Sequence, residues 1–436
     1  MNDLTFEFEW ADPLGARGPE LRATWARFAI RIDQRYASRV FDQNVKTVRE
    51  SVYLPLYPIA EWVASNWWRL LFEIESSERA ADPSYERRHD FRWAREGYSV
   101  PPLSFTAVGN VLQLQWMPEI LSLHQLEFLE TGSAYVSLGT AQQSLRAFVT
   151  AVTERLVACD ISDTYLQQEW RVVANTDAEE AEFCVAAATL GFDPYDLEEA
   201  VAASIVAVAE SLPTNIRREF FIVASRENLR EQSAVIKDGI EQLRENRADL
   251  RSLRYFRDSI PPASANGLAP WEDGYDAARA LRSDLKAGVR PIQSFDDLAD
   301  ILGVGHSQFL AAIVDQPLAG RAYEAIVATN HLEGPVFRTN PRHDTAKRFH
   351  VCRGLYEYLS GNDDGPWLVT TGLSDRQKRN RAFAAEFLAP SAGIRERVRS
   401  RVIPGSEVEE LAKHYGVSTD AIVHQLRNHR IASIAW

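Results

Sequence analysis

Two neighbouring stretches of the chain carry residue types and spacings that suit chemistry at a helix face. Arg348–Leu359 reads Arg-Phe-His-Val-Cys-Arg-Gly-Leu-Tyr-Glu-Tyr-Leu, and Arg381–Pro390 reads Arg-Ala-Phe-Ala-Ala-Glu-Phe-Leu-Ala-Pro. On a helix, Arg353 and Glu357 stand four residues apart and therefore share one face. Two histidines at this spacing would hold a zinc ion, and a glutamate after the first would act as general base. The chain offers a cation and an anion there, which predicts an ion pair.

No other catalytic motif stands out. None of the nine histidines has a second histidine four residues further on, so no displaced zinc motif is present. The sequence contains no phosphate-binding P-loop, no G-x-G-x-x-G and no G-x-S-x-G. The three cysteines are widely separated and form no C-x-x-C pair, which fits a reducing cytosol.

The two stretches resemble the core of the ImmA/IrrE-type metallopeptidases. In that family a helix of the form R-F-x-x-A-H-E-x-x-H precedes a helix of the form E-x-x-A-N-x-F-A-A-E-L-L-x-P. The resemblance covers residues 270–436, a little over a third of the chain. It implies a zincin-like fold for that part.

The resemblance also assigns the site positions. It places the first zinc ligand on Arg353 and the base on Gly354. The second ligand falls on Glu357 and the third on Gln377. A permanent cation, a missing base and a neutral amide make a degenerate motif, so neither catalytic residues nor a metal are expected. We expect the Arg353–Glu357 pair, with Gln377, to fill the former metal cavity. The alternative is an incidental ion pair at the surface.

Residues 407–430 have the spacing of a helix-turn-helix. If this segment bound DNA, the contacts would come from Ser418, Thr419, Gln425 and Arg427. The first helix is acidic, however, and ImmA/IrrE domains carry a similar segment within the peptidase module. Binding to nucleic acid is therefore an alternative that the sequence does not favour.

Length and composition limit the number of domains, the class of partner and the cellular compartment. A chain of 436 residues is long enough for two or three domains with their own cores. A net charge of −13 argues against a surface designed as a whole for nucleic acid. No basic-then-apolar leader and no apolar run of ~18 residues is present. The sequence thus predicts a cytoplasmic protein without membrane association.

Patterning predicts an α+β fold, mostly helical, with three domains. They are a strand-rich, tryptophan-rich domain at 1–137, a helical domain at 138–259, and the zincin-like domain at 270–436. In the first, Phe105–Val108 and Val111–Trp116 flank a Gly-Asn pair, which predicts a hairpin with a type II′ turn.

Tyr57–Phe72 is predicted to form a helix that carries Trp62, Trp67 and Trp68. These rings would provide either an aromatic platform for a ligand or buried area in the core. Core packing is favoured, because large aromatic side chains mostly supply buried area.

A heptad repeat runs through a highly charged stretch, with apolar residues at Leu229, Ile236, Leu243 and Leu250. Such a seam suits a partner helix, including one from a second copy of the chain. Polar residues and a glycine interrupt the heptads, so packing on its own domain is favoured over a homodimer.

Three functions follow from these observations. The first is a zinc-free pseudopeptidase that binds a protein partner, since ImmA/IrrE proteins cut or bind helix-turn-helix repressors. The resemblance places it in a bacterial toxin–antitoxin, phage-defence or stress-response setting. The second is an active zinc endopeptidase that cleaves a repressor-type protein, and only this one requires zinc. The third is a DNA-binding regulator.

Overall fold

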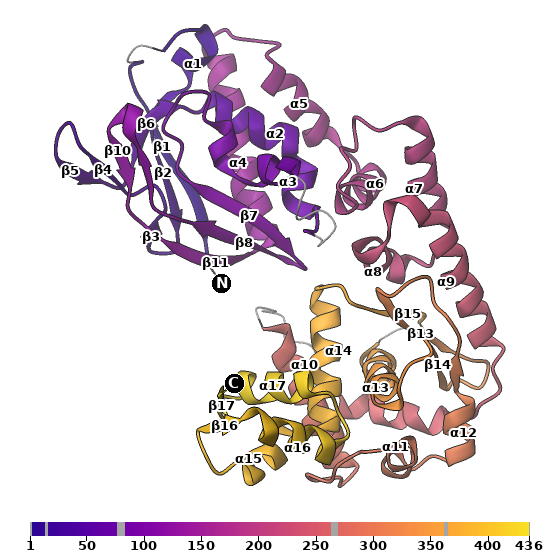
Figure 1. Ribbon diagram of the computed structural model, residues 1–436. Helices are drawn as coiled ribbons and strands as arrows, with labels where there is room; N and C mark the ends of the chain where they lie inside the picture. Colours follow the sequence, from indigo (N-terminus) through magenta and orange to yellow (C-terminus); the bar gives the residue numbers. More distant parts are fainter. Residues whose placement is uncertain (1, 14–15, 76–82, 263–268, 362–364, 436) are drawn as a thin grey trace. The chain divides into compact units, whose positions relative to one another are not determined.

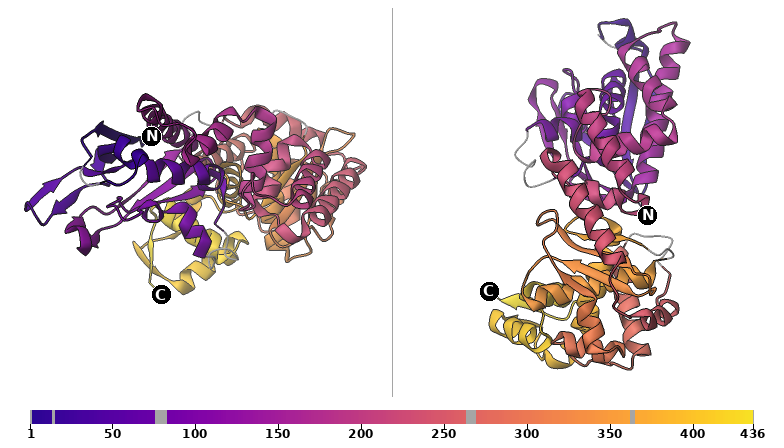
Figure 2. Two further views of the ribbon diagram at one scale, coloured as in Figure 1. Left: turned by 90° about the horizontal axis from the view of Figure 1, so that it is seen from above. Right: turned by 90° about the vertical axis from the view of Figure 1, so that its right-hand side faces the viewer.

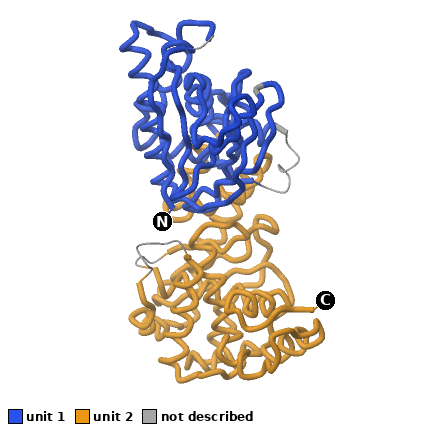
Figure 3. Tube along the Cα trace, turned by 90° about the vertical axis from the view of Figure 1, so that its left-hand side faces the viewer, with its two compact units in different colours: residues 1–203 blue, residues 204–436 orange. Residues whose placement is uncertain are grey.

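The chain folds into two compact units, residues 1–203 and 204–436 (Figure 3). The computed structural model describes residues 2–13, 16–75, 83–262, 269–361 and 365–435. It is about 52% helix and 19% strand, which confirms the predicted combination of a strand-rich N-terminal part and a helical C-terminal part. None of the described helices is both long enough and apolar enough to cross a membrane.

Unit 1 contains small antiparallel sheets and a group of helices (Figure 1). Its strands are β1 (Leu4–Trp10), β2 (Trp25–Ile32), β3 (Arg35–Tyr36), β4 (Val40–Asp42), β5 (Thr47–Arg49), β6 (Val52–Pro55), β7 (Leu103–Val108), β8 (Val111–Trp116), β9 (Glu119–Leu121), β10 (Leu126–Phe128) and β11 (Gly132–Ser137). Its helices are α1 (Pro19–Ala23), α2 (Tyr57–Phe72), α3 (Pro83–His89), η1 (Phe91–Ala94), η2 (Ser122–His124), α4 (Leu138–Ala158), α5 (Tyr165–Asn175) and α6 (Ala178–Thr189). The sheets have the strand orders β1-β2-β3 with β6 beside β2, β5-β4-β10-β9, and β11-β8-β7.

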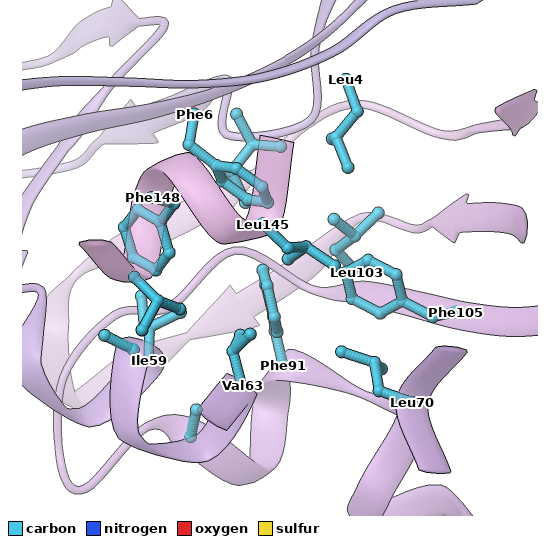
Figure 4. Packing of buried hydrophobic residues seen from close by; sticks show 14 of the residues in the cluster. Leu4, Phe6, Ile59, Val63, Leu70, Phe91, Leu103, Phe105, Leu145 and Phe148 are labelled. Atoms are coloured by element: carbon cyan, nitrogen blue, oxygen red, sulfur yellow. The ribbon is translucent and has the colours of Figure 1, made fainter. Parts of the chain in front are cut away.

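The core of unit 1 is built from aromatic and aliphatic side chains of the sheets and of helices α2 and α4. Figure 4 shows Phe6, Phe105 and Phe148 within this cluster. The ring centroids of Phe6 and Phe148 lie 5.0 Å apart, and those of Phe91 and Phe105 lie 4.9 Å apart. Aromatic pairs at these separations stabilise a core beyond the area they bury.

Local signals placed several elements of unit 1 correctly. Helix α2 has the predicted bounds, and Trp67 and Trp68 are buried in the core. Trp62 is half-buried and packs against the same core, with its ring centroid 5.3 Å from that of Phe91. The three rings therefore pack on the core, as favoured, and do not form an exposed platform. The predicted hairpin is β7–β8, and Gly109 at its turn has a φ of 67°, a conformation that suits glycine.

Unit 2 contains one four-stranded sheet surrounded by helices (Figures 1 and 2). Helix α7 (Glu199–Ser211) crosses the boundary between the units in sequence. The helices that follow are α8 (Thr214–Val223), η3 (Arg226–Asn228), α9 (Leu229–Arg244), η4 (Arg251–Ser259), α10 (Pro270–Asp284), α11 (Phe295–Leu302), α12 (His306–Ala311), α13 (Asp344–Ser360), α14 (Asp375–Leu388), α15 (Ser391–Arg397), α16 (Gly405–Tyr415) and α17 (Thr419–Asn428). The strands are β12 (Ile313–Asp315), β13 (Tyr323–Thr329), β14 (Pro335–Thr339), β15 (Trp367–Thr370), β16 (Val402–Pro404) and β17 (Ser433–Ala435).

The main sheet of unit 2 has the order β12-β14-β13-β15 and a helix on each face. A β-carbon on Gly239 of α9 would lie 2.6 Å from the Ile326 side chain. One on Gly354 of α13 would lie 2.6 Å from the side chain of Val327. Consecutive residues of a strand point to opposite faces, so α9 and α13 cover opposite sides of the sheet (Figure 1). Helix α14 packs on α13, and α10 packs on α14.

The predicted central domain at 138–259 is wrong as a separate unit. Helix α4 packs on strands β1, β8 and β11 of unit 1, whereas α9 packs on β13 and β14 of unit 2. Amphipathic periodicity shows that a helix has an apolar face, and it does not show which surface covers that face. Part of the linker on which the predicted boundary rested, residues 263–268, lies outside the described residues.

The predicted partner seam is also not available to a second copy. Leu229, Ile236 and Leu243 are buried, on a helix that packs against β13 and β14. Leu250 is buried too, but it lies beyond the end of α9 at Arg244, so the heptads do not form one continuous helix. The favoured alternative, packing on its own domain, is the one observed.

Candidate functional site

Helix α13 directs Arg353 and Glu357 toward α14. Both side chains are almost completely buried, with exposed fractions of 1% and 3%. A surface ion pair is therefore excluded, since such a pair would lie in solvent. Gly354, on the adjacent side of the helix, faces the sheet, where a β-carbon would come within 3.0 Å of the Phe337 ring. A larger side chain at 354 has no room unless the sheet moves.

Arg353 is the centre of a buried network of hydrogen bonds. Its Nε donates to Oδ1 of Asn380 at 2.7 Å. One terminal nitrogen donates to the Gln377 amide oxygen at 2.7 Å and to the Thr370 carbonyl at 2.8 Å. The other donates to the carboxylate of Glu324. The planar guanidinium thus reaches helix α14 and strands β13 and β15 at once.

Glu357 does not pair directly with Arg353, so the predicted ion pair is wrong in that detail. Its carboxylate accepts hydrogen bonds from Nε of Arg376 at 2.5 Å and from Nδ2 of Asn380 at 2.6 Å. Asn380 bridges the two residues, because its oxygen accepts from Arg353 while its nitrogen donates to Glu357. An amide has both a donor and an acceptor and can therefore join a cation to an anion.

Gln377 joins the same network, as predicted, and extends it to helix α8. Its amide oxygen accepts from Arg353 and from the Thr370 backbone N–H, the latter at 2.9 Å. Its amide nitrogen donates to Glu219 at 2.9 Å and to the Leu368 carbonyl at 2.8 Å. Ser374, the N-cap of α14, also donates to Glu219, at 2.6 Å. Every polar atom of the Gln377 side chain is thus used.

Sequence reasoning missed several members of the network, among them Glu219, Glu324 and Asn380. Asn380 stands three residues after Gln377, a helical spacing that placed it on the same face. Glu324 was visible as a charged residue within an apolar strand. Simple alternation from Val327 would turn it toward α9, but a bulge between Tyr323 and Ala325 lets it reach Arg353. We find no sequence signal for Glu219.

The charges of the network are balanced, with the arginines 353, 376 and 381 beside the glutamates 219, 324 and 357. Burial alone would raise the pKa of Glu324, but the His350 hydrogen bond and the Arg353 and Arg381 charges lower it to about 2. Burial raises the pKa of Glu357, and it lowers that of Arg353 to about 10 despite the nearby Glu324 charge.

These pKa shifts affect stability in a defined direction. Because the pKa of Glu324 is depressed from 4.5 to about 2, its ionised form stabilises the folded state above pH 4.5. That contribution is lost as the pH falls from about 4.5 to 2. Glu357 acts in the opposite sense, since a raised pKa favours the folded state more at lower pH.

The residues present do not fit a zinc ion. Arg353 brings a positive charge to the position that the resemblance assigns to the first ligand, and both oxygens of Glu357 already accept short hydrogen bonds. Among the described residues, no group of three or more His, Cys, Asp or Glu side chains is arranged to hold a metal. What the arrangement does chemically is tie α8, α13, α14, β13 and β15 together.

Glu357 and Arg376 also form part of the wall of a pocket of about 600 Å³. Tyr356, Trp367 and Arg379 contribute further to this wall. A molecule that entered the pocket would meet the arginine–glutamate pair at one edge of the network.

The helix-turn-helix segment is present as α16 and α17, but one predicted DNA contact is wrong. Gln425 is fully buried, and its amide nitrogen donates to Glu386 at 2.7 Å and to the Ala389 carbonyl at 2.8 Å. Its side chain joins α17 to α14 and cannot reach a groove. The other predicted contacts are exposed: Ser418, Thr419 and Arg427. Ser418 is the N-cap of α17.

We expect Gln425→Ala to destabilise unit 2 by about 1–3 kcal/mol, since the Glu386 carboxylate would lose a buried donor. Urea unfolding of the full chain measures this. The matched control is His424→Ala on the exposed side of α17, which should change the unfolding free energy by less than about 0.5 kcal/mol. Equal stability of the two variants would contradict the internal role of Gln425.

Comparison with known proteins gives no match to this chain among family models, curated proteins or solved structures.

Proposed function

We propose that residues 270–436 form a zincin-like domain of the ImmA/IrrE type whose catalytic site is degenerate. The protein would act as a regulatory component that binds another protein. One observation carries the proposal: the four residues that the resemblance assigns to the zinc ligands and the base, Arg353, Gly354, Glu357 and Gln377, are each committed to the network or to packing on the sheet.

The chemistry of these residues supports a role without catalysis. A zinc peptidase needs neutral or anionic ligands with free lone pairs and a base beside the bound water. Here the first position is a guanidinium, and the base position is a glycine pressed against Val327. Restoring a glutamate at that position would require the sheet to move. An active endopeptidase is therefore the weaker candidate.

The resemblance also supports a class of partner and a setting. ImmA/IrrE proteins act on or bind helix-turn-helix repressors, so we propose a repressor-type protein as the partner. The corresponding setting is a bacterial toxin–antitoxin, phage-defence or stress-response system. The burial of Gln425 weighs against the third candidate, a DNA-binding regulator.

Metal analysis of the purified full-length protein tests the proposal. After incubation with zinc and dialysis, we expect far less than one equivalent of metal per chain by mass spectrometry. A repressor-type protein encoded beside the gene should bind and remain uncleaved on prolonged incubation. One tightly held zinc per chain, or cleavage of the bound protein that a chelator stops, would overturn the proposal.

A further inference from the structure

The outer face of the β5-β4-β10-β9 sheet in unit 1 carries a row of mainly apolar side chains, and the packing of unit 1 does not explain their exposure. Antiparallel pairing sets Phe41 opposite both Val48 and Glu127, and Glu127 opposite Ile120. Directly paired residues of an antiparallel sheet point to the same face. The four residues Val48, Phe41, Glu127 and Ile120 therefore form one row across the sheet, termed here the outer row.

The two faces of this sheet differ sharply. On the inner face, Val40 and Phe128 are fully buried in the core of unit 1. In the outer row, by contrast, Val48 is 50% exposed and Ile120 is 63% exposed. A sheet with one solvated face normally carries polar residues there. Apolar side chains in a row on that face indicate a contact surface.

Exposed apolar residues also lie beside the row, in two turns at one end of the sheet. Val45 lies in the turn between β4 and β5 and is 60% exposed, and Leu123 lies between β9 and β10 and is 96% exposed. The two turns are joined by a backbone hydrogen bond of 2.9 Å from Gln43 to Gln125. They therefore lie at the same end of the sheet, and in Figure 1 this sheet stands at the margin of unit 1.

Glu127 gives the outer row a chemical preference. Neighbouring acidic side chains have arginine partners, in the pairs Asp42–Arg49, Glu119–Arg95 and Glu130–Arg39. No hydrogen bond or ion pair among the described residues reaches the Glu127 carboxylate, although it lies between Phe41 and Ile120. An apolar surface that covered this carboxylate without supplying a cation would bury an unpaired charge at high cost.

We propose that the outer row docks another protein through an apolar surface with a lysine or arginine at its centre. That cation would meet Glu127, while apolar groups cover Val48, Phe41 and Ile120. A second copy of this chain is a poor occupant, because a two-fold contact through the same patch brings Glu127 close to its own copy. The inference goes beyond the function proposed above, since it depends on unit 1 alone.

Site-specific photo-crosslinking of the full chain, in the cells that naturally produce it, tests this surface. The photoreactive residue replaces Val45, which lies beside the outer row and leaves the row intact. The control replaces Val157, which is 64% exposed on α4. We expect a crosslink from position 45 and none from 157, and peptide mapping should place it beside a lysine or arginine of a different protein.

Charge reversal then tests the predicted chemistry. Glu127→Lys should reduce the crosslink at least about tenfold, as expected for loss of a close interfacial charge pair. Glu154→Lys, an equal charge change at an exposed position of α4, should leave it within about twofold. Changing the mapped basic residue of the partner to glutamate should restore the crosslink to the Glu127→Lys protein.

The other outcomes overturn the proposal. They are a crosslink to a second copy of the chain, a crosslink to lipid alone, no crosslink in cells that contain the folded protein, and a crosslink that Glu127→Lys does not weaken. None of these results would alter the zinc content of unit 2, so the failure of this inference is distinguishable from failure of the pseudopeptidase proposal.

Discussion

Replacing Arg353 with methionine should destabilise unit 2 by about 3–5 kcal/mol and lower its unfolding temperature by about 6–20 °C. Methionine approximates the length of the side chain but removes every donor. Glu324 would keep a largely buried charge without its Arg353 partner, and Gln377 and Asn380 would each lose a donor. Calorimetry and urea unfolding of the full-length protein measure the effect.

The control for this change is Arg342→Met, because Arg342 is exposed at the surface of the same unit. Its effect should stay below about 0.5 kcal/mol. Arg353→Lys should fall between the two, since an ammonium group keeps the charge but cannot match the fork of donors that reaches α14 and both strands. If Arg353→Met were as stable as the control, the network would contribute nothing to the fold.

Gln377→Glu should also be strongly destabilising at neutral pH, although it changes only one atom of the side chain. The amide nitrogen that donates to Glu219 would become a carboxylate oxygen, 2.9 Å from another carboxylate oxygen and 2.8 Å from the Leu368 carbonyl. Two buried carboxylates at this separation cannot both stay ionised without penalty. We expect a loss of about 3–5 kcal/mol at pH 7, the usual cost of an uncompensated buried charge.

The pH dependence identifies the cause. The neighbouring charge raises the pKa of the introduced carboxyl in the folded state, so the destabilisation is complete above that pKa and shrinks as the pH falls. The difference in unfolding free energy between Gln377→Glu and the unchanged protein should therefore be smaller at pH 5 than at pH 8. Adding Glu219→Gln should recover part of the loss.

Gln242→Glu is the matched control, because Gln242 is exposed on α9 and the same change there should have little effect at any pH. A loss at Gln377 that is independent of pH, or that Glu219→Gln does not reduce, would contradict the carboxylate explanation. The result bears on function too. The resemblance places a zinc-binding glutamate at position 377. The Glu219 carboxylate would repel an ionised glutamate at that position.

Both predictions follow from how a network of this kind is stabilised. Charges in a protein interior are tolerated only when each has partners with good geometry, and removal of one member leaves the others unpaired. Arg353, Asn380 and Gln377 use nearly all of their donors and acceptors on one another, on nearby carboxylates and on the backbone of β15. Each substitution therefore costs more than the hydrogen bonds it removes.

The sequence determined the elements whose signals are local. The bounds of α2 follow from the proline at its start and its apolar face, and the β7–β8 hairpin follows from a Gly-Asn turn between alternating strands. The capping box of Ser294 and Asp297 and the left-handed Gly303 set the ends of α11. Such signals depend on residues only a few positions away, so they can be recognised without knowledge of the tertiary structure.

Helical spacing and the motif resemblance also predicted from the sequence that Arg353, Glu357 and Gln377 lie close together. It could not identify their partners. Glu219 comes from a helix more than a hundred residues earlier, and Glu324 points inward only because a bulge shifts the register of β13. Which side chain pairs with a buried charge depends on contacts between segments that are distant in the sequence, and no local pattern encodes these contacts.

Burial was decided in the same way. The apolar seam of α9 and the polar face of α17 were each considered as a partner surface, although packing on the chain's own domain was favoured for the seam and DNA binding was not favoured for α17. In the structure α9 covers the sheet, and Gln425 is hydrogen-bonded to α14. Periodicity identifies the face of a helix that seeks a contact, and only the tertiary structure shows whether the chain itself supplies that contact. Within unit 1, Val48 and Ile120 at the two ends of the outer row stay exposed, so unit 1 itself does not supply the contact for this face.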